Sequence, residues 1–409
     1  MKPDIYLYNP TCEIATGNGT LSYMPNRMLR QFERDLDGLP LFFAKEKDVL
    51  LVHQMPSASF LKTLNKANFP IPSIKLISEA LDDDDFIHQP KNRLCPWGWS
   101  PVVHHQLREL KASCSEGFKI HPVALWSDQQ RELYSRKAAM ELLQQILQEK
   151  DSDNYIEPKH GPVLCYCIEE VEVLFEQWPQ MVLKAPWSSS GRGIQVLRYG
   201  ELNQSVTQWI SGNLKSQGYI MAEPLLNKIH DFATQFEIRE DGSIKFLGHT
   251  HFSTNSNGQY HCNYLGGLPS DSDPAIREFL TEGRLQQLVA HLKTALENSP
   301  IAKNYQGFLG IDHLLIREMD GNLRIHPCLE INLRYNMGTL ALILEQHMLP
   351  ESRGSFHIFF QPGKSFAEFS YEMEKEHPLS MKDGKLKKGY LPLVDPGKDK
   401  AFGAYLLIS

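Results

Sequence analysis

The sequence contains no apolar stretch long enough to cross a membrane. A transmembrane helix needs about 18 or more consecutive apolar residues, and no apolar run in the 409 residues approaches that length. The opening segment, MKPDIYLYNP, also lacks the apolar core of a secretory signal peptide. We therefore expect a cytoplasmic protein with no membrane partner.

Paired cysteines and a surplus of basic residues are missing as well. The seven cysteines are scattered, and Cys165 and Cys167 lie one residue too close for a CxxC pair, which predicts free thiols. Acidic residues (49) outnumber lysine and arginine (42), so the formal net charge is −7. Because a nucleic-acid binder needs a basic surface, we expect no nucleic-acid partner. A local pocket for a small anion stays compatible with this charge.

What the chain does have is the composition and length of a globular protein with two to three domains. In the first 120 residues, apolar runs at Ile5–Tyr8, Val49–Val52 and Ile74–Ile77 alternate with helical stretches. That alternation predicts a small parallel α/β domain. Leu39–Ala44 is interpreted as a further strand, and the four aspartates from Asp82 to Asp85 as a solvated loop.

Two further units are expected after this domain. Residues 121–350 mix helices with strand pairs closed by tight turns, and their longest helical pattern runs from Gln129 to Glu149. Residues 351–409 are rich in Lys, Gly and Pro, and we interpret them as a small C-terminal appendage ending in the strand Ala404–Ile408. The predicted fold class is therefore α/β, divided at about residues 120 and 350.

The first chemical signal is a lysine at the end of an apolar strand, before a loop of small residues. Small residues let consecutive backbone N–H groups face one anion, to which Lys184 adds a point charge. A solvent-facing hairpin loop would show the same pattern, so both interpretations stay open. The loop residues that could bind phosphate are Ser188, Ser189, Ser190, Gly191 and Gly193.

A second segment could hold a nucleotide base. The strand ending at Glu223 is followed by Leu225 and Leu226, and Asp231 lies eight residues beyond the glutamate. Apolar residues can enclose an adenine ring, Glu223 can bind the ring edge, and Asp231 can accept hydrogen bonds from ribose hydroxyls. An ordinary strand end would look the same.

The third signal is sharper. Glu330, Asn332 and Arg334 are spaced two apart on a predicted strand, so their side chains point to one face, which Asp312 can reach from the neighbouring strand. Asp312, Glu330 and Asn332 would form an oxygen set suited to Mg²⁺ or Mn²⁺. Arg334 could bind a carboxylate or phosphate with two hydrogen bonds. The alternative is an exposed strand face with alternating polar residues.

Taken in order, these three elements resemble the ATP-grasp superfamily. The match consists of Lys184 with SSSGRG, AEPLL with Asp231, and GID with EINLR, within residues 127–347. The resemblance implies an α+β ATP-grasp domain of two subdomains, preceded by a small α/β domain. It also implies an earlier nucleotide-binding lysine at a helix start, for which Lys137 is the candidate. Arg136 stands where an acid is frequent in the family.

The resemblance also implies an activity. The protein would be an ATP-dependent ligase that activates a small-molecule carboxylate as an acylphosphate and joins it to an amine or similar nucleophile, with ATP and Mg²⁺ as cofactors. Lys184 and Lys137 would neutralise phosphoryl charge, and Arg334 would stabilise the oxyanion or hold the carboxylate. A small-molecule kinase and a non-catalytic nucleotide-binding module remain alternatives. The sequence names neither substrate and does not decide between a monomer and a homodimer.

Two other segments carry residues of interest. Three histidines on one predicted hairpin lack a clear fourth zinc ligand, so we favour a substrate pocket or ordinary hairpin residues over a zinc site. The loop Asn9–Glu13 follows the first strand, where α/β sheets collect ligands. It would bind the second substrate or form an ordinary turn, and Trp97 and Trp99 would pack a domain boundary. The histidines are His249, His251 and His261.

Overall fold

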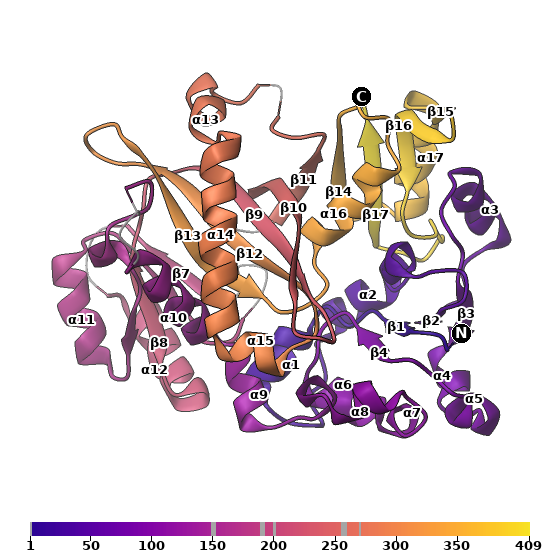
Figure 1. Cartoon of the computed structure of the whole chain (residues 1–409), viewed down its shortest axis with the longest axis horizontal. Helices are drawn as coiled ribbons and strands as arrows, with labels where there is room; N and C mark the ends of the chain where they lie inside the picture. The colour runs from indigo at the N-terminus through magenta and orange to yellow at the C-terminus, as the bar shows by residue number, and fades with distance from the viewer. Residues whose placement is uncertain (1, 149–152, 189–192, 199–201, 255–259, 270) are drawn as a thin grey trace.

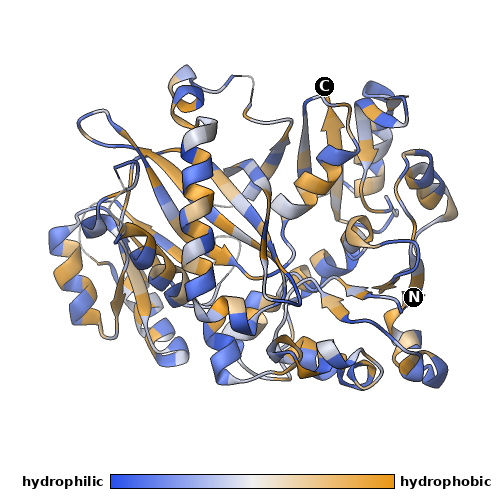
Figure 2. Ribbon diagram, in the orientation of Figure 1, coloured by the Kyte–Doolittle hydropathy of each residue, from blue (hydrophilic) through white to orange (hydrophobic). Residues whose placement is uncertain are grey.

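A computed structural model describes the chain except at residues 1, 149–152, 189–192, 199–201, 255–259 and 270 (Figure 1). Within that part, three sheets organise the molecule: a parallel four-stranded sheet, an antiparallel four-stranded sheet and a nine-stranded sheet. Apolar residues gather on the strands and on the helix faces that cover them (Figure 2). The mixed α/β fold class predicted from the sequence is confirmed.

The N-terminal sheet is parallel throughout, as the alternation of apolar runs and helices predicted. Its strand order is β3-β2-β1-β4, with β1 in register with both β2 and β4. The strands are β1 (Ile5–Leu7), β2 (Val49–Val52), β3 (Ser73–Leu76) and β4 (Leu94–Pro96). The helices are α1 (Cys12–Asn18), α2 (Arg27–Asp35), α3 (Ala58–Lys66), α4 (Ile77–Ala80), α5 (Asp84–His88), α6 (Pro101–Gln106), α7 (Arg108–Lys111) and α8 (Glu116–Ile120), with the 3₁₀ helices η1 (Leu39–Phe43) and η2 (Pro122–Ala124).

Two expectations for this domain were wrong. The apolar run at Leu39–Ala44 is the 3₁₀ helix η1 instead of a strand, because Pro40 cannot donate to a strand ladder and suits the first turn of a helix. The aspartate run is not a loop throughout: the carboxylate of Asp83 accepts a hydrogen bond from the backbone N–H of Phe86 (3.0 Å) and caps α5. In both segments a single residue, Pro40 or Asp83, decides the local structure, and the apolar or acidic composition of the segment does not reveal this.

The second sheet contains the strands of Lys184 and Glu223, which the sequence analysis assigned to phosphate and base binding. Its order is β5-β8-β6-β7, all antiparallel, and β6 and β7 form the expected hairpin. Its elements are β5 (Val163–Cys165), α11 (Ile168–Gln177), β6 (Met181–Lys184), β7 (Ile194–Leu197), α12 (Gln204–Gln217) and β8 (Ile220–Pro224). The two helices cover one face, and the group lies at one end of the molecule (Figure 1).

The nine-stranded sheet forms the centre of the molecule, with α14 lying across it (Figure 1). Its order is β13-β12-β9-β10-β11-β14-β17-β16-β15. Its strands are β9 (Lys228–Ile238), β10 (Ile244–Thr254), β11 (Tyr260–Leu265), β12 (Gly307–Arg317), β13 (Leu323–Asn332), β14 (Gly354–Phe360), β15 (Ser380–Lys382), β16 (Lys385–Pro392) and β17 (Phe402–Ile408). The remaining helices are η3 (Pro158–His160), α9 (Asp128–Leu133), α10 (Arg136–Leu147), α13 (Pro274–Phe279), α14 (Glu282–Asn298), α15 (Pro300–Asn304), α16 (Met337–Gln346) and α17 (Phe366–Glu376).

The C-terminal segment is more integrated than an appendage. It ends on the expected apolar strand, but β14 pairs with β11 and β17, so residues 351–409 extend the central sheet. Phe356 and Phe402 also share one hydrophobic core with Leu36 and Phe60 of the N-terminal domain. The limits at residues 120 and 350 therefore stay a prediction.

The long helix expected over residues 129–149 is divided into α9 and α10. The Ser135 hydroxyl donates to the carbonyl of Glu132 (2.7 Å), and the backbone N–H of Arg136 donates to the carbonyl of Pro186 (2.9 Å). The chain thus turns here to meet the loop after β6. Across the described ranges, no helix has both the length and the apolar character needed to cross a membrane.

Candidate active site

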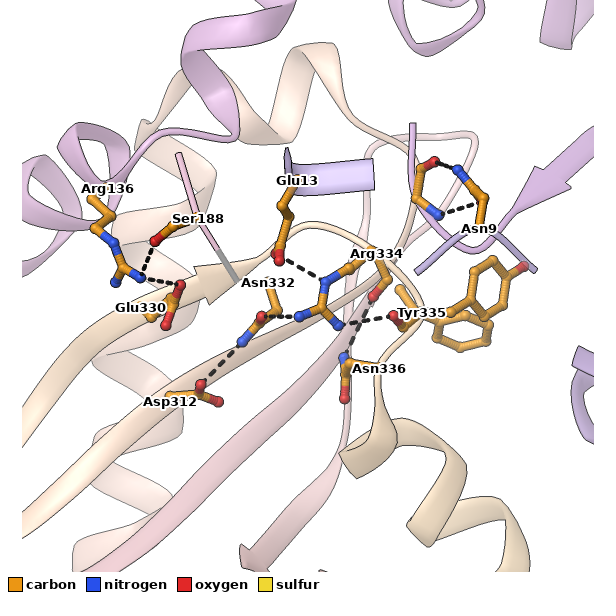
Figure 3. A network of polar contacts seen from close by, with 12 residues as sticks. Asn9, Glu13, Arg136, Ser188, Asp312, Glu330, Asn332, Arg334, Tyr335 and Asn336 are labelled. Carbon is orange, nitrogen blue, oxygen red and sulfur yellow. Dashed lines mark hydrogen bonds and ion pairs between the residues drawn. The ribbon is translucent and has the colours of Figure 1, made fainter. Parts of the chain in front are cut away.

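The residues of the third sequence signal form a row of polar side chains at the edge of the central sheet. This row consists of Asp312, Glu330 and Asn332. The antiparallel register of β12 and β13 places Asp312 opposite Glu330 and Gly310 opposite Asn332. The amide nitrogen of Asn332 donates to a carboxylate oxygen of Asp312 (3.1 Å; Figure 3). Ile331, between the two polar residues of β13, is buried in the hydrophobic core. The alternation predicted from the spacing is therefore present.

The two carboxylates of this row hold negative charge in a partly buried place. Burial first, and the charge of Glu330 second, raise the pKa of Asp312 to about 7. A divalent cation between Asp312 and Glu330 would offset that charge, and carboxylate oxygens are ligands that Mg²⁺ prefers. These two residues therefore fit the predicted cation.

Asn332 is oriented differently from the expectation. Its side-chain oxygen accepts a hydrogen bond from Nη2 of Arg334 (2.7 Å), while its amide nitrogen is the atom directed at Asp312. To ligate a cation beside Asp312, the amide would have to rotate and break both hydrogen bonds. In this structure Asn332 links the carboxylate row to the arginine.

Arg334 follows β13 and lies beside the row, as predicted, but its main ion-pair partner comes from the other end of the chain. Its Nε donates to Oε1 of Glu13 on α1 (2.9 Å), and its Nη1 donates to the carbonyl of Tyr335 (3.3 Å). The side chains of Arg334 and Glu13 are only 18% and 12% exposed. The sequence flagged the loop Asn9–Glu13 but gave no sign of this pair.

A glycine makes this approach of two distant segments possible. A Cβ atom at Gly98 would lie 2.3 Å from Sγ of Cys12 and 3.2 Å from Cβ of Arg334. The side chain of Asn9 fixes Gly98 by donating to its carbonyl (2.7 Å) and accepting from its N–H (3.3 Å). The carbonyl of Trp97 accepts from the N–H of Tyr335 (2.8 Å). The segment around Trp97 thus packs where the N-terminal and central sheets meet.

The lysine predicted to bind phosphate is paired with the residue predicted to bind adenine. Lys184 on β6 forms an ion pair with Glu223 on the adjacent strand β8, and the two side chains are 5% and 10% exposed. His326 on β13 is also buried, and neither ring nitrogen has a hydrogen-bond partner in the described part of the chain. Burial, with the charge of Lys184 adding, lowers the pKa of His326 to about 3. The sequence analysis did not single out His326.

Arg136, the apparent departure from the family pattern, is the residue that reaches the row. Its buried guanidinium lies 3.1 Å from the Glu330 carboxylate and donates to the Ser188 hydroxyl (3.1 Å; Figure 3). It also donates to the Ala185 carbonyl (3.0 Å). Lys137 points elsewhere: its Nζ lies 4.0 Å from Glu141 on the exposed side of α10. The structure therefore does not bring Lys137 to the other candidates.

The rest of the loop is described only in part. Ala185 donates its N–H to the carbonyl of Gly193 (2.8 Å), and a Cβ on Gly193 would lie 2.3 Å from Cβ of Ser188, so the loop closes tightly at its base. Ser189, Ser190 and Gly191 lie outside the described residues.

The residues predicted to enclose the base and ribose lie at two places. Leu225 donates its N–H to the carbonyl of Gln180 (3.0 Å), and Leu226 packs on the central core. Asp231 is buried on β9, where its carboxylate accepts from Lys228 (2.7 Å) and Thr254 (2.9 Å). The register of β9 and β12 places Asp231 opposite Leu314, two residues along the strand from Asp312.

The histidines form hydrogen-bonded pairs instead of a metal site. His251 lies 3.0 Å from His230, and the Thr234 hydroxyl lies 3.1 Å from His249 and 2.7 Å from His313. His261 contacts Ser253. Among the described residues, no group of three or more His, Cys, Asp or Glu side chains could hold a metal ion. All seven cysteines are free thiols.

No protein-family model matches the chain. A curated relative is the [butirosin acyl-carrier protein]–L-glutamate ligase of Niallia circulans, which is 25% identical over 320 residues. The match covers 75% of this chain and 66% of that protein, so the chain spans about two thirds of the length of the relative.

Solved structures with the same architecture identify the fold. The N5-carboxyaminoimidazole synthetase from Staphylococcus aureus, complexed with ADP, matches with a TM-score of 0.50 and 10% identity over 100% of this chain and 94% of that chain. Biotin carboxylase from Campylobacter jejuni, in a β,γ-ATP complex, matches with a TM-score of 0.53 and 13% identity over 100% and 88%. Both are ATP-grasp enzymes. The chain therefore has the fold of these ATP-grasp enzymes, as the sequence predicted.

Proposed function

We propose that the protein is an ATP-dependent ligase that converts a carboxylate into an acylphosphate and transfers the acyl group to an amine or a thiol. The observation that carries this proposal is the pair of facing carboxylates, Asp312 and Glu330, flanked by the guanidinium groups of Arg136 and Arg334. Phosphoryl transfer depends on preorganised charge around the moving group. This row supplies it from groups that are already held in place.

Each residue then has a role that its contacts support. Lys184 and Ser188 would bind the ATP phosphates, with Ser189, Ser190, Gly191 and Gly193 closing the loop, and Glu223, Leu225, Leu226 and Asp231 would surround the base and ribose. Asp312 and Glu330 would hold Mg²⁺ or Mn²⁺, which supplies Lewis-acid stabilisation of the phosphates when bound. Arg136 would take the phosphate-binding role that we expected for Lys137, because its guanidinium already joins Glu330 to Ser188.

Arg334 would stabilise the negative oxygen that develops when the nucleophile attacks the acyl carbon. Its guanidinium is held by Glu13, Asn332 and the Tyr335 carbonyl before any substrate binds. A charge that needs no rearrangement during the reaction stabilises a transition state most effectively.

The curated relative narrows the substrates to test. Its name describes a ligase for L-glutamate and a carrier protein, so we propose an amino acid as the carboxylate substrate, with L-glutamate as the first probe. The relative also favours a ligase over the small-molecule kinase and the binding module. A reducing cytoplasm would suit the seven free thiols.

The test is a turnover assay with Mg-ATP, L-glutamate and hydroxylamine, a small nucleophile that converts acylphosphates into hydroxamates. We expect hydroxamate and free phosphate to appear together, each requiring the carboxylate, and Glu330→Gln to abolish both. Glu46→Gln, at an exposed position, is the matched control. Phosphate retained on a product would support a kinase instead. The absence of any ATP turnover with L-glutamate and the other amino acids would refute the proposed ligase.

A further inference from the structure

One oxygen of Glu13 has no partner in this otherwise connected site. Oε1 accepts the hydrogen bond from Arg334, whereas Oε2 is buried and has no hydrogen-bond partner within the described residues. Buried polar atoms in proteins are nearly always paired, and an unpaired carboxylate oxygen is costly. The position of Glu13 therefore calls for a donor that the described residues do not provide.

Among the described residues, the neighbours of Glu13 do not offer that donor. The three bonded nitrogens of Arg334 are directed to Glu13 Oε1, Asn332 and the Tyr335 carbonyl. The Cys12 thiol is buried against Gly98, and burial raises its pKa to about 12, so it stays neutral. The Glu13 side chain keeps 12% of its surface exposed, but Oε2 itself is buried, so a ligand reaches that oxygen only when the neighbouring side chains move apart.

We propose that Oε2 of Glu13 binds a primary ammonium group of a substrate and accepts a proton from it. An ammonium group has three donors and no acceptor, so it complements a buried carboxylate oxygen. The proposal rests on the proposed ligase function, because it places the nitrogen beside Arg334, where the acyl group would be held. It assigns to α1 of the N-terminal domain a part in the reaction.

The reaction step balances with Glu13 as the base. One N–H proton passes from the ammonium to Oε2, and the freed lone pair attacks the acyl carbon while Arg334 stabilises the resulting oxyanion. The new C–N bond forms, the bond from the acyl carbon to the phosphate oxygen breaks, and the second N–H proton leaves with inorganic phosphate. The products are an amide, hydrogen phosphate and protonated Glu13, which returns its proton to solvent.

The ammonium group that Glu13 binds could belong to the amine acceptor or to an amino acid that serves as the carboxylate donor. Two comparisons of substrates distinguish these possibilities. Hydroxylamine is uncharged at neutral pH, so it needs no ammonium site, whereas methylamine is an ammonium ion there. L-glutamate carries an α-ammonium group, whereas glutarate is the same carboxylate without one. Comparing these four probes shows which substrate, if either, depends on Glu13.

The decisive variant is Glu13→Gln, which keeps an oxygen acceptor for Arg334 but removes the negative charge and the basicity. Losing a charged hydrogen bond should lower kcat/KM for the ammonium-bearing probe by about tenfold or more. If the site serves the acceptor, methylamine loses at least tenfold more activity than hydroxylamine does with L-glutamate, and raising the pH towards the pKa of methylamine reduces this difference. If it serves the donor, L-glutamate loses at least tenfold more activity with hydroxylamine than glutarate does, and this result refutes the proton transfer to Glu13 while it keeps the ammonium site. Glu46→Gln controls for the substitution itself, and a thermal melt confirms that both variants fold.

Two results would overturn the inference. Equal losses with charged and uncharged probes would mean that Glu13 only positions Arg334, and unchanged kinetics with all four probes would mean that it takes no part. In both cases the wild-type protein still forms hydroxamate. A wild-type protein that forms none from any carboxylate would instead refute the proposed ligase function, and with it the role given to Glu13.

Discussion

Lys184→Met should destabilise the small antiparallel sheet as well as weaken nucleotide binding. Lys184 and Glu223 form an ion pair on adjacent strands with side chains only 5% and 10% exposed. Removing one partner of a buried pair leaves the other charge without compensation, which costs about 3–5 kcal/mol. The single variant should therefore lose that amount, even though the lysine lies in a site expected to bind a ligand.

The double variant Lys184→Met with Glu223→Leu separates the two effects. Replacing a buried pair by apolar residues of similar size is often neutral or stabilising, so the second substitution should restore most of the lost stability. Amide hydrogen exchange of β6 and β8 measures this locally, which suits a multidomain chain that need not unfold in two states. Both variants should lose the rise in melting temperature that Mg-ATP gives the wild-type protein.

Three outcomes would contradict this reasoning. If Lys184→Met exchanges as slowly as the wild type, the buried pair does not stabilise the sheet. If the double variant is as unstable as the single one, the loss comes from packing and not from the isolated charge of Glu223. If the double variant keeps the full ATP-dependent shift, Lys184 is not a phosphate ligand.

Three further predictions follow from named contacts. Glu330→Gln should reduce ATP turnover by about 100-fold or more. The melting temperature should fall by a smaller amount, because Glu330 is 26% exposed and the glutamine oxygen can still accept a hydrogen bond from the buried Arg136. Gly98→Ala should destabilise the protein by about 1–3 kcal/mol and slow turnover, because the added Cβ would lie 2.3 Å from Sγ of Cys12. Gly38→Ala is the matched control in thermal melts, since its Cβ would lie at an ordinary 3.7 Å from the side chain of Val394. Burial lowers the pKa of several histidines to about 3 to 4, against about 6.5 in the unfolded chain, so the unfolded chain binds more protons below pH 6.5. The free energy of unfolding should therefore fall as the pH drops from 6.5 towards 4, by about 1.4 kcal/mol per pH unit for each histidine. Thermal melts that show no loss of stability between pH 6.5 and 5 would contradict this prediction. These histidines are His230, His249, His251 and His326.

The parts of the fold that sequence reasoning predicted are those set by local patterns. Apolar runs alternating with helices predicted the parallel sheet, and a spacing of two placed Glu330 and Asn332 on one face. The failures came where one residue or a distant contact overrides the pattern. Pro40 turns an apolar run into a 3₁₀ helix, and the Arg136–Pro186 hydrogen bond divides a continuous helical pattern.

In the candidate site, too, the features set by local spacing were predicted and those set by distant contacts were not. The rotation of α10, which turns Arg136 inward and Lys137 outward, depends on where the helix meets the loop after β6, and no local spacing encodes that meeting. Glu13 and Arg334 are 321 residues apart, so their ion pair leaves no motif. Gly98 was an available signal, because a glycine between two tryptophans at a domain boundary indicates close backbone approach.

The position of Arg334 gives the N-terminal domain and the central sheet a joint part in the proposed reaction. A free arginine side chain carries about 2 kcal/mol of rotamer entropy, and a mobile guanidinium would have to lose it in the transition state. Here Asn332 from β13, Glu13 from α1 and the backbone held against Gly98 orient the group in advance. The contact between the two domains therefore carries part of the proposed catalytic effect. A substitution such as Gly98→Ala, at a residue that donates no side chain to the site, should for that reason lower the rate of acyl transfer more than it lowers the affinity for ATP.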